Sequence, residues 1–433
     1  MENNERMSKQ LGLLGAFLGL VLLGLLLACG SSYNASSDGL VIVGSQGSAV
    51  LETFSFTLNS GHVSAIANSP NDTGNDVCLL SGLPGAIVVD STGSYAFAII
   101  HQNSSCSGSA TGIATFQISS GGNIKQTAGL VSFNGDVTPY RIARDSAGKF
   151  LFVADRANPN GAGAVSVFAI ASGGSLTEVP GSPFSMPPAP LTPDIVDVAA
   201  SPTTFPSIGV NGTVNSVCSV PGTVAPTSQY LYAVDTNNYG VWEFSVNTST
   251  GVLGAPSPKA TQAAFFATDK IPMGIAVDPC DRFVYVSNSL TNKISEYTIC
   301  IAATANGPCP RADGSLVPIT GSPLALTGSA NGPGPLVVDP YGNNVYVVDT
   351  LSNTVSGFKI SSVTGTLEPL SPATVATGTQ PTSIAIRGDD NWLFVTNYGS
   401  ATVSHYSVTP ATGALSVLPT IGTDNYPWGV AVK

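Results

Sequence analysis

Short runs of Val, Ile, Phe and Tyr extend along the chain from about residue 39 to its end, and Gly, Pro, Asn or Asp separate them every few residues. Apolar and polar positions alternate within most runs, a pattern typical of short strands with one buried face. The pattern predicts an all-β protein made of many short strands joined by turns. It argues against a helical bundle or a coiled coil.

The runs are of four kinds, which recur in the same order. The first is a Pro followed by an apolar strand, as at residues 272–278, and the second is an aromatic strand ending in Asn or Asp, as at 285–288. The third places an aliphatic residue three positions before an aromatic one, as in Ile294 and Tyr297, and the fourth begins with Gly-x-aliphatic, as at Gly314. Each kind occurs seven times, and the copy of the first kind that begins at Pro193 is less regular than the others. Four antiparallel strands repeated seven times predict a seven-bladed β-propeller.

The two ends of this pattern complement each other. The chain ends after a strand of the first kind, residues 427–432, and the repeats begin with a strand of the second kind, residues 40–43. We therefore expect one blade to be split between residues 39–70 and 426–433, closed by pairing of the C-terminal strand with the N-terminal blade. Such closure leaves no free sheet edge.

A separate apolar run, residues 11–27, precedes the repeats. It ends in Leu26-Leu27-Ala28-Cys29, which resembles the bacterial lipobox, so we expect cleavage before Cys29 and acylation of its thiol. Residues 1–28 are then a lipoprotein signal peptide, 29–38 a flexible tether and 39–433 the propeller. Because no Asp follows Cys29, the expected location is the bacterial cell envelope, lipid-anchored at the outer membrane or cell surface. An uncleaved membrane anchor remains the alternative, and either Met1 or Met7 is the start.

Charge narrows the range of partners. Charged residues are only 9% of the chain, and the net charge is −11 with 15 Lys and Arg. This balance excludes binding that follows a phosphate backbone, so no nucleic-acid partner is expected.

The repeats also resemble a known family. Phe394-Val395-Thr396-Asn397 is similar to the YVTN-type repeat, and Gly-Ser-Pro after the last strand recurs at Gly181 and Gly321. Together with the Pro-x-x-Ile-Ala-Val-Asp-Pro run, these motifs resemble the seven-bladed lactonase family over about residues 39–433. That family includes propeller-type 6-phosphogluconolactonases and carboxymuconate-cyclising enzymes. The resemblance implies the propeller fold, and its best-understood enzymes use His, Arg and Glu at the mouth of the channel.

Six cysteines remain after Cys29, an even number that suits disulfides in an exported protein. The predicted topology places them in pairs: Cys78 with Cys106 on one face, Cys218 with Cys280 on the other, and Cys300 with Cys309 within one loop. Free thiols in a reducing compartment are the alternative.

Candidate chemistry gathers where loops enter the first strands and leave the second strands, a side of the ring that we call the top face. Arg141 stands where other repeats have Gly274, Pro335, Ser383 or Gly429, and His101 and Arg156 share a column otherwise filled by Thr236, Ser289, Thr350 and Tyr398. Two Arg and one His would suit a carboxylate or phosphate ligand, with His as general base. We therefore name His101, Arg141 and Arg156 as catalytic candidates, and as ligand-binding candidates Asp155, Asp194, Asp235, Tyr398 and Trp428.

Structural roles for the same residues remain open. Most Asp and Asn that end the second strands would cap the following turn. Arg156 would pair with Asp155 at the surface, and His101 would be a solvated loop residue.

Two functions are compatible with this pattern. No Glu falls in a top-face loop, and His62 and His405 fall in outer strands. We therefore expect a monomeric binding platform for an unknown envelope protein or a small polar or anionic ligand. The alternative is a lactone hydrolase resembling propeller-type 6-phosphogluconolactonase. Neither a metal nor a cofactor is expected, and the membrane is contacted through the lipid anchor only.

Overall fold

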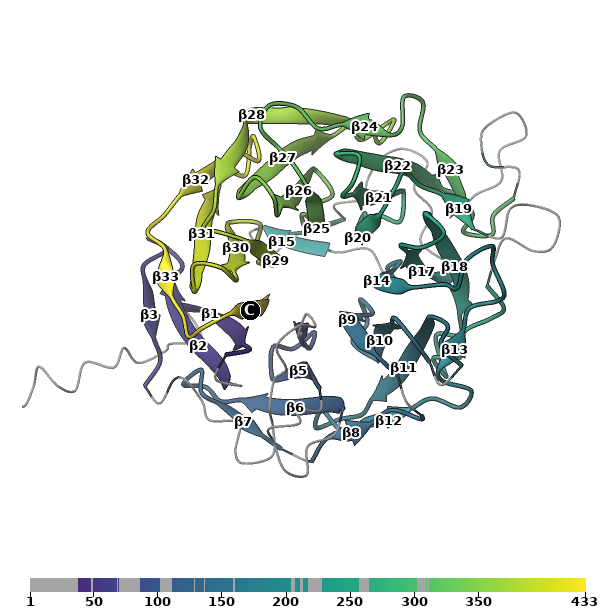
Figure 1. Ribbon diagram of the computed structural model, residues 1–433. Helices are drawn as coiled ribbons and strands as arrows, with labels where there is room; N and C mark the ends of the chain where they lie inside the picture. Colours follow the sequence, from purple (N-terminus) through teal and green to yellow (C-terminus); the bar gives the residue numbers. More distant parts are fainter. Residues whose placement is uncertain are drawn as a thin grey trace, which may run out of the picture.

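The computed structural model describes residues 38–47, 50–67, 69, 86–101, 111–127, 129–135, 137–158, 160–203, 207–210, 213–216, 228–256, 265–301, 309 and 311–433. Seven antiparallel sheets stand in a ring around a central channel (Figure 1). The predicted seven-bladed β-propeller with four strands per blade is thereby confirmed. No helix long and apolar enough to span a bilayer occurs in these ranges.

Each blade begins with its innermost strand at the channel, and the other strands follow outward. Blade 1 consists of β34 (Pro427–Val432), β1 (Asp38–Ser45), β2 (Val50–Thr57) and β3 (Val63–Ala65). Blade 2 consists of β4 (Ile87–Val89), β5 (Tyr95–Ile100), β6 (Gly112–Ile118) and β7 (Ile124–Gln126), with β8 (Val131–Ser132) also on β6. Blade 3 consists of β9 (Pro139–Arg144), β10 (Phe150–Asp155), β11 (Ala164–Ile170) and β12 (Leu176–Glu178), with β13 (Phe184–Ser185) on β11. Blade 4 consists of β14 (Ile195–Ala200), β17 (Gln229–Asp235), β18 (Gly240–Val246) and β19 (Phe266–Ala267).

Blades 5 to 7 repeat the arrangement. Blade 5 has β20 (Pro272–Val277), β21 (Phe283–Asn288), β22 (Lys293–Ile299) and β23 (Leu316–Pro318), with β24 (Leu324–Ala325) on β22. Blade 6 has β25 (Pro333–Val338), β26 (Asn344–Asp349), β27 (Thr354–Ile360) and β28 (Leu367–Ala376). Blade 7 has β29 (Pro381–Ile386), β30 (Trp392–Asn397), β31 (Thr402–Val408) and β32 (Leu415–Val417), with β33 (Ile421–Gly422) on β31. A separate hairpin, β15 (Ser207–Val210) and β16 (Thr213–Ser216), follows β14.

One predicted strand is reduced. The repeat pattern predicts that Gly251 begins the outermost strand of blade 4, but only an isolated bridge joins Val246 to Leu253 there. The edge of β18 is instead paired at Val241 by Phe266 of β19.

The ring closes as the sequence predicts. β34 pairs antiparallel with β1, with Val432 opposite Val41 and Val430 opposite Val43. The pairing continues to the last residue, because Lys433 and Leu40 exchange backbone hydrogen bonds of 2.9 and 3.3 Å. The C-terminal strand is thus the innermost strand of the N-terminal blade (Figure 1).

Apolar side chains fill the spaces between the blades. Among the residues that the structure describes, the buried apolar side chains form seven clusters, and each cluster joins two neighbouring blades. The cluster between blades 7 and 1, for example, packs Phe394 and Trp392 against Val41 and Phe56. The alternation along each strand therefore serves two interfaces, since successive side chains point to opposite faces of a blade.

Tyrosines of the second strands explain the glycine that begins the fourth strands. Tyr232, Tyr285 and Tyr346 each donate the phenol O–H to a carbonyl of the next blade, at 2.7–2.8 Å; the acceptors are Gly314, Gly365 and Gly413. Gly314 adopts φ +80°, and a Cβ there would lie 2.4 Å from the ring of Tyr230. Only glycine fits this close approach of two blades.

His405 makes the same link where the tyrosine is missing. Blade 7 has Phe394 at the tyrosine position, and the cross-strand residue His405 stacks on its ring. Nε2 of His405 lies 3.1 Å from the carbonyl oxygen of Gly61 in blade 1. Burial lowers the pKa of His405, so the imidazole stays neutral and donates from Nε2. His405 is therefore a structural residue.

The described disulfide matches one predicted pair. Cys300 and Cys309 are bonded, with their Cα atoms 5.1 Å apart. Cys280 is buried and also disulfide-bonded. The predicted partners Cys78, Cys106 and Cys218 lie outside the described residues, as do residues 1–28, Cys29 and most of the tether.

Candidate functional site

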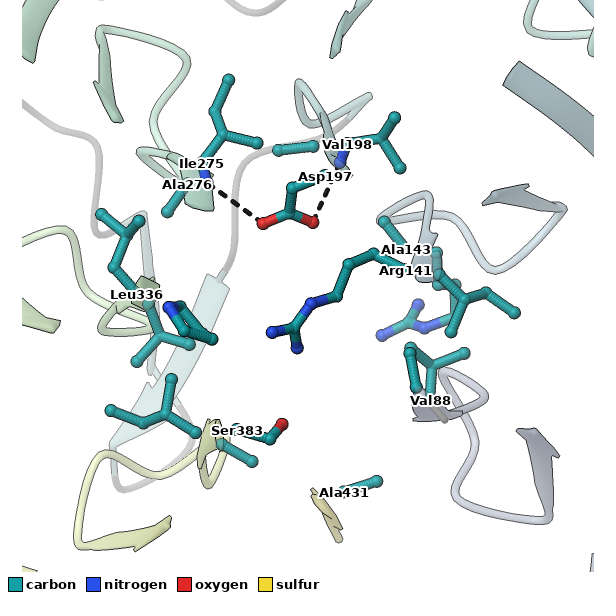
Figure 2. A pocket seen from close by; sticks show the side chains of 18 of the residues that line it. Val88, Arg141, Ala143, Asp197, Val198, Ile275, Ala276, Leu336, Ser383 and Ala431 are labelled. Atoms are coloured by element: carbon teal, nitrogen blue, oxygen red, sulfur yellow. Dashed lines mark hydrogen bonds between the residues drawn. The ribbon is translucent and has the colours of Figure 1, made fainter. Parts of the chain in front are cut away.

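The innermost strands of the blades surround a cavity of about 460 Å³ in the central channel. Its wall combines small and aliphatic side chains, among them Val88, Ala143 and Leu336, with backbone groups on the inner edges of the strands (Figure 2). Its volume lies within the range of small-molecule sites, roughly 300–1,000 Å³. The channel is therefore large enough for a metabolite.

One level of this channel is occupied by two charged residues in neighbouring blades. Arg141 of β9 lies opposite Ala154, and Asp197 of β14 lies opposite Val234. Both positions follow the bulge near the start of the innermost strand, so they are equivalent. The other blades have small side chains at this level, namely Ala86, Gly274, Pro335, Ser383 and Gly429. These small residues leave the space into which the two charged side chains extend.

Arg141 crosses the channel. Its Nη2 donates to the backbone carbonyl of Thr382 in blade 7, at 3.2 Å. Its Nε is buried and has no acceptor in the described part of the chain. Figure 2 shows the guanidinium near the middle of the cavity. Part of its hydrogen-bonding capacity is thus unused.

Asp197 is a site residue that the repeat pattern did not reveal. Its carboxylate accepts the backbone N–H of Val198 at 2.9 Å and that of Ile275 in blade 5 at 3.1 Å (Figure 2). Burial raises the pKa of Asp197 to about 6, although the charge of Arg141 and the two backbone donors act in the opposite direction.

The repeat pattern missed Asp197 because the first strand of blade 4 begins two residues later than the pattern predicts. The repeat pattern places the start of this strand at Pro193, but Ile195 occupies the place that Pro139 has in blade 3. Aligning the ends of the two strands, Ala199-Ala200 on Ala143-Arg144, would have placed Asp197 beside Arg141.

Arg156 is held by neighbours other than Asp155. It forms a two-point ion pair with Asp194, with Nε–Oδ1 and Nη2–Oδ2 distances of 2.8 and 2.6 Å. Its guanidinium also lies 5.2 Å from the centre of the Tyr140 ring. The pair joins blade 3 to the loop that enters blade 4, and neither residue lines the cavity. Asp194 therefore already occupies the Nε and Nη2 donors of Arg156.

Asp155 and Asp235 are buried within their blades. Asp155 accepts the hydroxyl of Ser166 at 2.6 Å, and burial raises its pKa well above the usual range. Asp235 accepts the indole N–H of Trp242 at 3.1 Å and the amide of Asn238 at 2.8 Å. Side chains that end the other second strands behave alike, as in the pairs Asn288–Ser295, Asp349–Ser356 and Asn397–Ser404. This column organises the top-face turns from inside.

His101 is buried rather than solvated. It is 3% exposed, and burial lowers its pKa to about 4. The imidazole is therefore neutral at pH 7 and a weak base there. His101 does not line the cavity that contains Arg141.

Tyr398 and Trp428 belong to an aromatic cluster on the top face between blades 7 and 1. The ring of Tyr398 stacks on Tyr426 at 4.8 Å and meets Trp428 edge-on at 5.1 Å. Tyr426 is 48% exposed. Tyr426 thus presents an aromatic ring to solvent at this face, and none of the three residues lines the cavity.

The structure therefore brings Arg141 together with Asp197, and it places Arg156 and His101 in separate surroundings. Buried Glu side chains are used structurally, as in Glu52, which accepts Ser45 Oγ at 2.6 Å. Within the described residues, no group of three or more His, Cys, Asp or Glu side chains is arranged to hold a metal ion.

Comparison with known proteins agrees with this architecture. Residues 315–427 match the family model described as Lactonase, 7-bladed beta-propeller. This segment resembles that family, and the chain as a whole is a seven-bladed β-propeller. The matched segment runs from the outer part of blade 5 to the start of β34, so it contains neither Arg141 nor Asp197. No curated protein sequence matches the chain.

Solved structures similar to this chain share its fold at low sequence identity. The periplasmic gluconolactonase of Pseudomonas aeruginosa is 18% identical, with a TM-score of 0.64 over 92% of this chain and 99% of that one. A candidate 6-phosphogluconolactonase of Bacteroides fragilis is 17% identical, with a TM-score of 0.65 over 92% and 98%. A Lactobacillus plantarum protein is 16% identical, with a TM-score of 0.65 over 92% and 99%. At these identities the likeness concerns the fold.

Proposed function

We propose that this lactonase-like propeller binds a small polar or anionic ligand in the upper part of its central channel. The observation that carries the proposal is the guanidinium of Arg141, which extends into a cavity of about 460 Å³ while its Nε has no acceptor among the described residues. A guanidinium held in this way recognises carboxylate or phosphate groups through charge-assisted hydrogen bonds. The Tyr398 cluster would contact the ligand as it enters.

Hydrolysis of a lactone is the second candidate. Asp197 favours it, because a carboxyl with a pKa near 6 is suited to general base catalysis near neutral pH. Arg141 would then stabilise the negative charge that develops on the carbonyl oxygen when water attacks. The names of two similar structures, a gluconolactonase and a candidate 6-phosphogluconolactonase, point to sugar lactones as the first substrates to test.

One experiment separates the two functions. The soluble domain, residues 30–433 with its disulfides formed, is assayed against aliphatic, sugar and aryl lactones and titrated with gluconate as a carboxylate probe. We expect gluconate to bind, and Arg141→Ala to weaken binding by about 10- to 100-fold, the value of one charge-assisted contact. His101→Ala, outside the cavity, is expected to change binding less than threefold.

The outcomes are distinct. Lactone turnover that disappears in Arg141→Ala would establish the hydrolase. Unchanged gluconate affinity in Arg141→Ala, or no binding at all, would reject the channel as the site of an anionic ligand.

We also propose that the propeller is lipid-anchored in the bacterial envelope through Cys29. The support is the lipobox-like Leu26-Leu27-Ala28-Cys29 and the small polar tether that follows it. The membrane-fraction protein should begin at an acylated Cys29, and a Cys29→Ser variant should lose the acyl mass. An N-terminus at Met1 or Met7 in the membrane fraction would contradict this.

A further inference from the structure

Two opposite charges extend into the upper channel without forming an ion pair. The ion pairs among the described residues join Arg156 to Asp194, Arg282 to Asp278, Lys293 to Asp269 and Arg387 to Asp389. Arg141 and Asp197 come from adjacent blades and both line the cavity, yet they are not among these ion pairs. Figure 2 shows the guanidinium and the carboxylate directed into the same space.

The hydrogen bonds of the Arg141 guanidinium and the Asp197 carboxylate are made with backbone groups. Asp197 uses one oxygen for the N–H of Val198 and the other for the N–H of Ile275. Arg141 uses Nη2 for the carbonyl of Thr382 and leaves Nε without an acceptor among the described residues. Both side chains are thus held by the strands while their charges stay available to a third group.

We infer that Arg141 and Asp197 together bind the carboxylate of a small hydroxylated acid, and that binding transfers one proton from solvent to Asp197. This inference rests on the proposed binding function and specifies its ligand class. The ligand carboxylate accepts hydrogen bonds from the guanidinium. The protonated Asp197 then donates its O–H to the same carboxylate.

Asp197 takes up a proton because Arg141, the cation that acts on it, does not balance two carboxylates, its own and that of the ligand. Arg141 is the cation that favours the ionised form of Asp197, and Arg144 is the other cation lining the cavity. Strand β20, packed against β14, has no charged residue, and the carboxylate of Asp235 on β17 is occupied by Trp242 and Asn238. Two carboxylates sharing the guanidinium of Arg141 would repel each other, and such pairs take up one proton.

Free Asp197 is close to accepting that proton. Its pKa of about 6 means that it is mostly ionised at pH 7 and about half protonated at pH 6. Nearly complete protonation at pH 7 requires ligand binding to raise this pKa by about two units, which is within the range that a like charge at a shared site produces.

The polar groups that line the cavity indicate that the ligand carries hydroxyl groups. The innermost strand of each blade is a sheet edge, so backbone N–H and C=O groups face the channel. Two of them already bond channel side chains, since Thr382 accepts from Arg141 and Ile275 donates to Asp197. A ligand that carries hydroxyl groups satisfies such groups, whereas an alkyl chain would leave them unpaired.

The test uses the soluble domain and gluconate, a hydroxylated carboxylate that is fully ionised above pH 5. Affinity and proton uptake are measured by calorimetry at pH 5, 6, 7 and 8, in two buffers of different ionisation enthalpy. We expect affinity to be about tenfold lower at pH 7 than at pH 5, with uptake of about one proton at pH 7. Asp197→Asn should bind with the same affinity at every pH and take up no proton.

Asp269→Asn is the matched control. Asp269 is another top-face acid, paired with Lys293 at 2.9 Å, and it does not line the cavity. This variant should keep the pH dependence of the parent. Circular dichroism and urea unfolding of each variant show whether it is folded.

The two proposals fail in different ways. If gluconate binds but its affinity does not depend on pH, or if proton uptake survives in Asp197→Asn, this inference is overturned while the binding function stands. If gluconate does not bind between pH 5 and 8, both are overturned.

Discussion

Deleting residues 427–433 is expected to prevent formation of the stable ring. These residues form β34, which supplies the innermost strand of blade 1 and buries Val430 and Ala431. Its loss exposes the edge of β1 and opens the interface between blades 7 and 1. Each large aliphatic side chain that loses its burial costs about 1.5–3 kcal/mol. With the lost backbone pairing, the total rivals the roughly 5–15 kcal/mol that stabilises a typical domain.

Urea unfolding of the domain with and without residues 427–433 measures this effect. The truncated domain should lose the cooperative transition or show a much lower midpoint, and it should elute as larger species because unpaired edges associate. Adding a synthetic 427–433 peptide should restore part of the transition. An unchanged midpoint after truncation would contradict the closure mechanism.

Replacing Asp390 is expected to stabilise the protein. Asp390 is 1% exposed and adopts φ +58° in the turn between β29 and β30, where the corresponding turns of blades 3 and 6 have Gly148 and Gly342. Neither of its carboxyl oxygens has a partner among the described residues. Burial, together with the charges of Asp339 and Asp389, raises the pKa of Asp390 to about 8. Asp390 is therefore protonated at neutral pH.

This raised pKa gives stability a definite dependence on pH. Between the unfolded pKa, near 4, and the folded pKa, near 8, the folded protein binds more protons than the unfolded chain, so stability falls as pH rises. The full cost at pH 7 would be on the order of 4 kcal/mol for this shift. Asp390→Gly removes the buried carboxyl and also the unfavourable φ, which costs about 1–2 kcal/mol for a side chain with Cβ.

Urea unfolding between pH 4 and pH 8 tests this prediction. Asp390→Gly should raise the free energy of unfolding by roughly 5 kcal/mol or more at pH 8, and by only about 1–2 kcal/mol, the relief of the unfavourable φ, at pH 4. Asp390→Asn separates the two effects, because it removes the titrating carboxyl while a residue with a Cβ keeps the same positive φ, which Asn tolerates. Asp313→Asn is the control, since Asp313 is exposed and is not among the charges that act on Asp390. A profile unchanged by Asp390→Asn would show that another group causes the pH dependence.

The buried carboxyl of Asp281 should account for part of the pH dependence of stability that remains after Asp390 is replaced. It takes the corresponding place in blade 5 with φ +56°, and burial, with the charge of Asp278, raises its pKa to about 8. The effects of Asp281→Asn and Asp390→Asn should therefore add when the two substitutions are combined, because blade 6 separates the two turns.

The site was visible in the sequence only in part. Arg141 stands out in the sequence because the aligned positions of the other repeats are Gly, Pro or Ser. In the structure it lies near the top-face end of its strand and lines the cavity. Asp197 was hidden, because a two-residue difference in how the loop enters blade 4 displaced it from its column. The partner of Arg156 was also missed, since Asp194 is 38 residues away and approaches only when blades 3 and 4 pack.

The sequence by itself determined the number of blades, the order of their strands, the closure by residues 427–432 and the Cys300–Cys309 bond. These features follow from alternation, turn residues and spacing, which act between residues near each other in the chain or in register within one sheet. Only the tertiary structure decided which side chains meet between blades: the tyrosine–glycine links, the buried Asp390, and the joint position of Arg141 and Asp197. Those contacts depend on how one sheet packs beside the next, and burial there decides each pKa; the repeat pattern carries no record of either.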